Sequence, residues 1–199
     1  MSIRPNNYCA LLCRDPRRLR LINCHPEVTD LVRRCLEESG LKFEFNESSN
    51  VTCSFKFSKY LFRRRSFTSE GDGIKIRSAL ANILAEMSKI GWEVDFTTDI
   101  GRHLTNSCIF FTKNFDQKEE ANGNVFTFAP SGTSNAILID VPDGIENQLV
   151  DGIKEIVKIS DPEKLDTKSS RIEMSSFAWY STGDSAIKIR YADDTYLEL

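Results

Sequence analysis

Six cysteines are the first candidates for chemistry in this chain of 199 residues. Cys9 and Cys13 are predicted to lie on one face of a strand, and Cys24, His25 and Cys35 are the nearest further donors. Structural zinc sites usually combine two ligand pairs, each with members a few residues apart, and a second pair of that spacing is missing here. We therefore expect buried free thiols, no metal site and no cofactor.

Catalytic chemistry has little support in the residue pattern. Only His25 and His103 could act as imidazole bases, and His103 lies in the segment 99–108, which also contains acid and nucleophile types. A polar hairpin loop has the same composition, and closeness in sequence does not create hydrogen-bond geometry. No glycine-rich phosphate loop, zinc-protease motif or serine-hydrolase motif occurs. The sequence thus predicts no catalytic residues and a protein that is not an enzyme.

Arginines form the most suggestive surface feature, because the guanidinium fork suits phosphate and carboxylate groups. They gather in a predicted hairpin, a predicted helix and a predicted loop of the first third of the chain. These candidate binding residues are Arg14, Arg17, Arg18, Arg20, Arg33, Arg34, Arg63, Arg64 and Arg65. They predict contact with an acidic protein surface, a nucleic acid or an anionic lipid headgroup.

The charge of the chain is unevenly distributed along its length. The whole chain carries a net charge of −3, but residues 1–65 hold 13 Lys/Arg against 7 Asp/Glu, and residues 116–199 hold 8 against 16. Two segments of opposite charge attract one another, and a basic first segment also suits an external anionic partner. The sequence leaves both readings open.

Ser66 is a candidate phosphorylation site. It follows Arg63–Arg65 directly, in a segment whose composition predicts an exposed loop. A phosphate there adds a charge of about −1.5 to −2 beside the three arginines. Phosphorylation is therefore expected to weaken binding of anionic partners.

The chain resembles itself at an offset of about 117 residues. The segment 21–23 (Leu-Ile-Asn) recurs at 138–140 (Leu-Ile-Asp), and the apolar positions of the helix that follows recur with the same spacing. Most matched positions are apolar, so the repeat indicates a duplicated folding unit. The inward helix positions, all expected to be buried, are Val28, Val32 and Leu36 in the first copy and Ile145, Leu149 and Ile153 in the second.

Local periodicity predicts the elements of each copy. In the first copy we expect strands over 8–13, 19–23, 41–45, 51–57, 92–96 and 108–112, helices over 26–39 and 74–89, and a loop over 63–73. In the second we expect strands over 125–128, 136–141, 172–177 and 186–199, a helix after Pro142 and a loop over 160–170.

These elements predict an α+β fold with two related lobes from an internal duplication. In each lobe, antiparallel strands are covered by one or two helices. Residues 1–115 form the first lobe, 116–123 a linker, and 124–199 a second, truncated lobe.

Four short motifs resemble those of an uncharacterised eukaryotic family. Its pattern "R-L-I-D-x-P" before a helix is similar to residues 20–23, and "F-x-L-x-x-x-x-W" is similar to 55–62. The patterns "G-W-x-x-x-x-x-D" and "F-F" match residues 91–99 and 110–111. Asn23 and Phe62 depart from the pattern, which has Asp and Trp there. The resemblance implies a repeated fold and carries no activity.

Composition limits the class of protein. No secretory signal and no membrane-length apolar run occur in the sequence, which predicts a cytoplasmic or nuclear protein. We expect a non-catalytic intracellular module that binds another protein. The alternative is nucleic-acid or phosphate-headgroup binding through the arginine clusters of the first lobe. The sequence predicts no oligomeric state.

Overall fold

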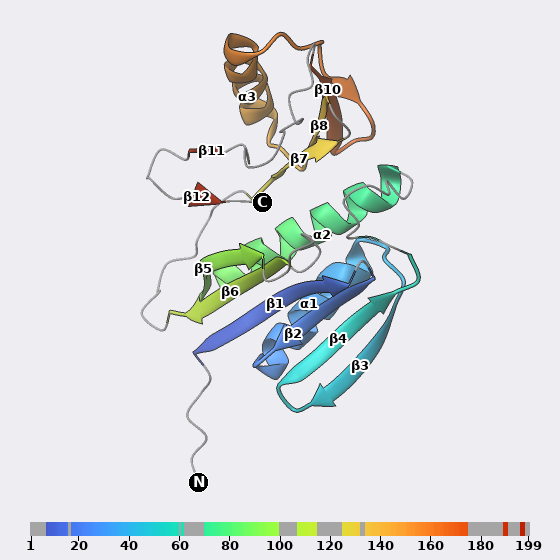
Figure 1. Ribbon diagram of the computed structural model, residues 1–199, viewed down its shortest axis with the longest axis vertical. Coiled ribbons are helices and arrows are strands. Elements are labelled where there is room, and N and C mark those ends of the chain that lie inside the picture. Colours follow the sequence, from blue (N-terminus) through green and yellow to red (C-terminus); the bar gives the residue numbers. More distant parts are fainter. Residues whose placement is uncertain are drawn as a thin grey trace. The chain divides into compact units, whose positions relative to one another are not determined.

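The computed structural model describes residues 7–15, 17–59, 61, 70–99, 107–114, 125–131, 134–174, 189–190 and 196–197. The chain divides into two compact units, Met1–Gly123 and Asn124–Leu199 (Figure 1). Helices and antiparallel sheets make the fold α+β, as the sequence predicts. No helix among the described residues is long and apolar enough to cross a bilayer.

The first unit contains a six-stranded antiparallel sheet with the strand order β3-β4-β2-β1-β6-β5. Two helices pack against one face of this sheet (Figure 1). The strands are β1 (Tyr8–Asp15), β2 (Arg18–Ile22), β3 (Phe43–Ser49), β4 (Thr52–Phe57), β5 (Trp92–Asp99) and β6 (Ser107–Lys113). The helices are α1 (Pro26–Glu38) and α2 (Glu70–Lys89).

Helix α1 begins and ends where the sequence predicts. Pro26 occupies its first turn, where a missing N–H costs nothing, and the His25 Nδ1 atom accepts a hydrogen bond from the Glu27 N–H at 3.4 Å. Gly40 adopts a φ of +68°, which favours glycine and ends the helix. The inward positions, all buried, are Val28, Leu31, Val32, Cys35 and Leu36.

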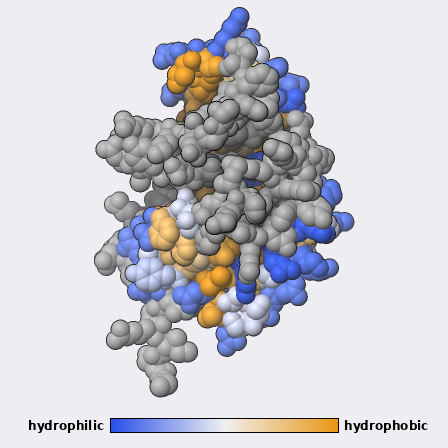
Figure 2. Space-filling model, viewed as in Figure 1, coloured by the Kyte–Doolittle hydropathy of each residue, from blue (hydrophilic) through white to orange (hydrophobic). Residues whose placement is uncertain are grey.

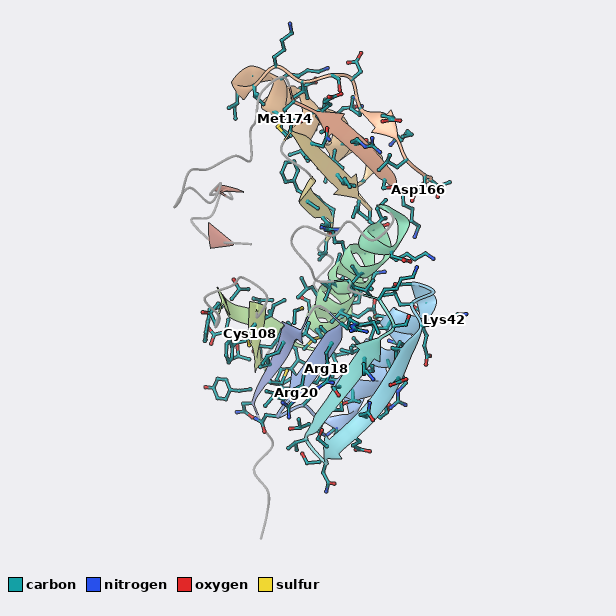
Figure 3. The ribbon with its side chains drawn as sticks, turned by 45° about the vertical axis from the view of Figure 1, so that its right-hand side comes forward. Arg18, Arg20, Lys42, Cys108, Asp166 and Met174 are labelled. Atoms are coloured by element: carbon teal, nitrogen blue, oxygen red, sulfur yellow. The ribbon has the colours of Figure 1, made fainter. Side chains whose placement is uncertain are left out.

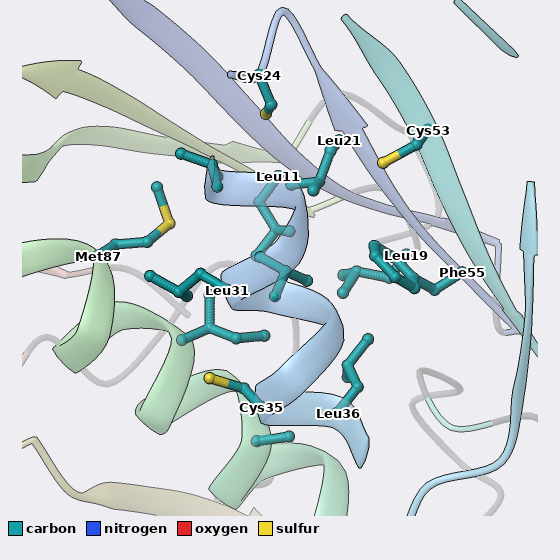
Figure 4. Packing of buried hydrophobic residues seen from close by; sticks show 14 of the residues in the cluster. Leu11, Leu19, Leu21, Cys24, Leu31, Cys35, Leu36, Cys53, Phe55 and Met87 are labelled. Carbon is teal, nitrogen blue, oxygen red and sulfur yellow. The ribbon is translucent and has the colours of Figure 1, made fainter. Parts of the chain in front are cut away.

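The core of the first unit lies between the sheet and the two helices (Figure 4). Leu19 and Phe55 project from neighbouring strands towards Leu31 and Leu36 of α1, and Met87 enters from α2. Each such side chain contributes about 1.5–3 kcal/mol when it is fully buried. The core therefore fixes which face of every strand points towards the helices.

Helix α2 begins earlier than the sequence predicts. It starts at Glu70, so the prediction of a loop over 63–73 is wrong for its last four residues. Two glycines in this turn lower the helix propensity, but the Asp72 carboxylate accepts a hydrogen bond from Lys59, and Ile74 and Ile76 are buried. Tertiary contacts thus outweigh the local preference.

The described residues of the second unit form a smaller antiparallel sheet with the strand order β7-β8-β10-β9, together with one helix. Its elements are β7 (Thr127–Ser131), β8 (Asn135–Ile139), α3 (Asp143–Ile156), β9 (Glu163–Lys164) and β10 (Ser169–Glu173). The predicted loop over 160–170 is wrong where it overlaps β9 and β10. In the predicted strand over 186–199, the described residues form two short strands, β11 (Ile189–Arg190) and β12 (Tyr196–Leu197), which pair with each other.

The two units share their strand registers at a constant offset of 117 residues. The agreement covers three strand pairs of the first sheet, and each has a counterpart in the second. Leu11↔Leu21, Ile22↔Thr52 and Glu47↔Cys53 recur as Phe128↔Leu138, Ile139↔Ser169 and Lys164↔Ser170. The order β3-β4-β2-β1 therefore corresponds, strand by strand, to β9-β10-β8-β7.

Burial of the helices differs between the two units. Val28 of α1 is 0% exposed, whereas Ile145, its counterpart in α3, is 37% exposed. The prediction that all inward helix positions are buried is wrong at Ile145, and Leu149 and Ile153 are only half-buried. Helix α1 packs against both the sheet and α2, while α3 is the only helix among the described residues of its unit.

Candidate binding surface

The open face, by which we mean the face of the six-stranded sheet opposite α1 and α2, carries both arginines of β2. Leu19 and Leu21 point towards the helices and are buried. Because successive side chains of a strand point to opposite faces, Arg18 and Arg20 lie on the open face. Figure 3 labels both arginines near β2, and Cys108 on β6. The alternating pattern of β2 thus positions two guanidinium groups on one surface.

Strand pairing extends the open face from the arginines to aromatic residues. Residues directly opposite each other in neighbouring strands share a face, so the registers define rows that cross the sheet. One row reads Arg20–Leu12–Cys108 across β2, β1 and β6. The adjacent row reads Ile22–Ala10–Phe110–Phe96 and ends on β5.

A β-bulge at Asp95 brings Phe96 to the open face. Val94 pairs with Phe111 on the helix side, but the register shifts and Phe96 pairs with Phe110 on the opposite side. Phe96 and Phe110 stack with their ring centroids 4.4 Å apart and their planes at 18°. Strict alternation would have placed Phe96 on the same side as Val94, so the extra residue re-aims this ring.

Tyr8 adds a second exposed ring at the start of β1. Its side chain is 64% exposed, and that of Phe96 is 50% exposed. The Tyr8 carbonyl accepts a hydrogen bond from the Asn23 side-chain amide at 2.7 Å, which holds this end of the strand against the turn after β2. Figure 2 shows hydrophobic atoms reaching the surface of the first unit with hydrophilic atoms beside them.

The basic part of the open face lies on β2 and β4. Arg18 is exposed and Arg20 is half-buried. Lys56 lies opposite Arg18 and donates to Glu44 at 3.2 Å. Among the side chains that the structure describes, neither Arg18 nor Arg20 is paired with a carboxylate, so both can bind an external anion.

Arg33 and Arg34 lie away from the open face, on the helix layer. The Arg33 guanidinium lies 4.3 Å from the centre of the Phe45 ring and 3.6 Å from the Asp30 carboxylate. The Arg34 guanidinium lies 3.7 Å from Glu86 of α2. Both arginines therefore have structural contacts, and the structure separates them from Arg18 and Arg20.

The remaining predicted binding residues occupy other places in the chain. Arg17 lies in the turn between β1 and β2, where its carbonyl accepts from the Phe57 N–H at 2.7 Å. Arg14 is a residue of β1, and the structure describes its backbone but not its side chain. Arg63–Arg65 and Ser66 also lie outside the described residues.

The six cysteines are free thiols, and five of them are buried. Burial raises the pKa of Cys13 to about 12 and that of Cys108 to about 11. A hydrogen bond with Cys9, together with burial, raises the pKa of Cys24. Thiols of raised pKa are poor nucleophiles and poor metal ligands at neutral pH. Within the described residues, no group of three or more Cys, His, Asp or Glu side chains could hold a metal ion.

A polar cluster in the second unit is the other group of side chains that could take part in a reaction. Glu146 accepts hydrogen bonds from Lys164 at 2.7 Å and from Ser170, beside a hollow of about 190 Å³. Hydrogen bonds from Lys164 and Ser170 lower the pKa of the Glu146 carboxyl group. A carboxylate stabilised in this way is a weak base, so the cluster ties α3 to β9 and β10 and does not activate the serine.

Sequence reasoning missed the aromatic residues of the open face. Regular alternation along the predicted strand 92–96 would place Phe96 on the face of Trp92 and Val94, and the bulge moves it to the other face. Tyr8 gave no signal beyond its place at the start of an apolar run.

Comparison with known proteins shows which family the chain belongs to. A model of an uncharacterised domain family matches residues 7–114, which is more than half of the chain. The chain belongs to this family. The matched residues run from the start of β1 to the end of β6 and so contain the whole open face. No curated protein matches the chain.

The match is consistent with the resemblance to an uncharacterised family. It covers the first unit of the chain, so the likeness between the units rests on their shared registers.

Proposed function

We propose that this chain is a non-catalytic interaction module and that the open face of the first unit is its binding surface. The observation that carries the proposal is the combination on one sheet face of two exposed rings, Tyr8 and Phe96, with Arg18 and Arg20. Tyrosine and arginine are among the residues that most often dominate binding energy at interfaces, and phenylalanine is enriched there. The proposal includes a cytoplasmic or nuclear location.

Chemical considerations support a binding role over catalysis. The thiols of Cys13, Cys24 and Cys108 have raised pKa values, and the Glu146 carboxylate has a lowered one. A nucleophile or general base needs the opposite shifts to work near neutral pH. These groups are therefore assigned to packing and to structural hydrogen bonds.

The second unit supports placing the surface in the first. We infer that the two units arose by internal duplication, because their registers agree at one offset. At the positions of Arg18 and Arg20, the second unit has Asn135 and a buried Ile137. Under this inference the basic face is a property of the first unit alone.

Recovery of partners from cell lysate tests the proposal. The full chain and its Tyr8→Ser/Phe96→Ser variant are each immobilised, and bound protein and nucleic acid are quantified with and without nuclease treatment. A control variant, Lys42→Gln/Lys75→Gln, changes two exposed residues away from the open face. We expect the control to recover the wild-type set and the face variant to lose it.

One outcome of this experiment would contradict the proposal. If the face variant recovers the same molecules in the same amounts as the wild-type chain, the binding surface lies elsewhere. Circular dichroism of each variant ensures that a loss reflects the surface and not unfolding.

A further inference from the structure

We infer that the ligand of the open face is single-stranded nucleic acid, an inference that rests on the proposed binding role of this face. Single strands are bound without sequence preference by aromatic side chains that stack on bases and by basic residues that follow the backbone. The open face supplies both kinds of residue from strands of one sheet, the rings from β5 and β1 and the arginines from β2.

The aromatic part of the face suits base stacking. Phe96 is half exposed and stacks on Phe110 of the neighbouring strand with nearly parallel planes, so one face of its ring is fixed by this partner. A ring fixed in this way loses little conformational entropy when a base stacks on it. Tyr8, on β1, offers a second ring on the same face.

The basic part of the face lies within reach of the same strand of nucleic acid. Phe110 belongs to β6 and Arg20 to β2, with β1 between them. Two inter-strand spacings place these strands about 10 Å apart, and the exposed ring of Phe96 lies one strand further, about 14 Å from β2 across the sheet. Ala10 lies between the two parts and Ser54 lies opposite Arg20; both side chains are small and buried, so the larger side chains around them form the surface of the face.

The exposed rings of the face favour a single strand over a duplex. Rings that stand on a sheet can stack only on bases whose faces are free, and duplex bases are stacked on one another. A protein partner would use Phe96 as a hydrophobic contact and would not need an aromatic plane. Replacement of Phe96 by leucine therefore separates the two occupants, since leucine keeps the apolar surface and removes the plane.

Fluorescence anisotropy with the purified full chain tests the inference. The probes are a fluorescein-labelled oligouridine of about 12 nucleotides, the corresponding oligothymidine and a duplex of the same length. We expect both single strands to bind and the duplex to bind at least about tenfold more weakly. Phe96→Leu should weaken single-strand binding by about fivefold or more, in line with the loss of one stacked base.

Salt dependence tests the arginines separately. The Arg18→Gln/Arg20→Gln variant removes two phosphate contacts. The slope of log K against log salt concentration is negative, and its magnitude should fall by about 1.4 in this variant. The matched control Lys42→Gln/Lys75→Gln removes two exposed charges elsewhere and should leave the slope unchanged. Arg33→Gln and Arg34→Gln, which alter the helix layer, should bind within about twofold of wild type.

Three outcomes overturn the inference. The first is the absence of single-strand binding; if lysate recovery still depends on Tyr8 and Phe96, the binding role survives and the ligand is a protein. The second is equal single-strand binding by the wild type, Phe96→Leu and Arg18→Gln/Arg20→Gln, which places the nucleic acid elsewhere. The third is a dimer in size-exclusion chromatography that Tyr8→Ser/Phe96→Ser converts to a monomer, which makes the face a contact between two copies of this chain.

Discussion

Asn23 and Asp140 adopt the same left-handed backbone conformation, with φ angles of 58° and 57°. Each residue follows the second strand of its sheet, and 117 positions separate them. This conformation favours glycine, which has no Cβ, and asparagine and aspartate, whose short polar side chains can hydrogen-bond to the local backbone. In each unit, this turn leads the chain from the second strand of the sheet into the helix that follows.

Replacement of Asn23 should separate the cost of backbone strain from that of a hydrogen bond. Asn23→Ala should destabilise the chain by about 2–3 kcal/mol, since it introduces strain and removes the bond to the Tyr8 carbonyl. Asn23→Gly should cost only about 1 kcal/mol, because glycine accepts the positive φ. Urea denaturation followed by circular dichroism measures both values. Equal losses for alanine and glycine would show that strain contributes nothing.

Equivalent helix positions should respond differently to a buried charge. Val28→Asp should destabilise the first unit by more than about 3 kcal/mol, because the position is completely buried in the hydrophobic core. Ile145→Asp should cost less than about 1 kcal/mol, because that side chain is partly exposed. The same denaturation experiment compares them. Similar losses would contradict the difference in packing between α1 and α3.

The thiol of Cys13 should make stability depend on pH in the alkaline range. Burial raises its pKa from the ordinary 9.0 to about 12, so the unfolded chain loses this proton first as the pH rises. The resulting contribution to stability is complete below pH 9 and declines as the pH rises towards 12. Wild type should therefore lose more stability than Cys13→Ala between about pH 8 and about pH 10.5, measured as the shift in the urea midpoint. An identical shift in both proteins would place Cys13 in contact with solvent.

Deletion of Asp95 should leave the sheet intact. Val94 and Phe96 already pair with Phe111 and Phe110, which are adjacent, so Asp95 is the extra residue of the bulge. Without it, regular alternation still places Phe96 on the open face. We expect a change in thermal midpoint of only a few degrees and unchanged binding of the single-stranded probes. A large loss of either would show that the bulge itself holds Phe96 in place.

Several elements were predictable from the sequence because their signals are local. Pro26 and Gly40 mark the two ends of α1, and the alternation of Leu19 and Leu21 with Arg18 and Arg20 defines the two faces of β2. Such patterns reflect steric preferences and side-chain periods that act over a few residues. The early start of α2 was missed because long-range contacts there outweigh local propensity.

The composition of the open face was decided only by the tertiary structure. The sequence places arginines on β2. Only the strand order puts β6 and β5 next to β1, and it thereby brings Phe110 and Phe96 to the same sheet face as these arginines. It also separates Arg33 and Arg34 from the other arginines, because α1 packs on the opposite side of the sheet. Strand pairing between distant segments and the bulge at Asp95 depend on contacts across the whole unit, and these leave no periodic signal within a single strand.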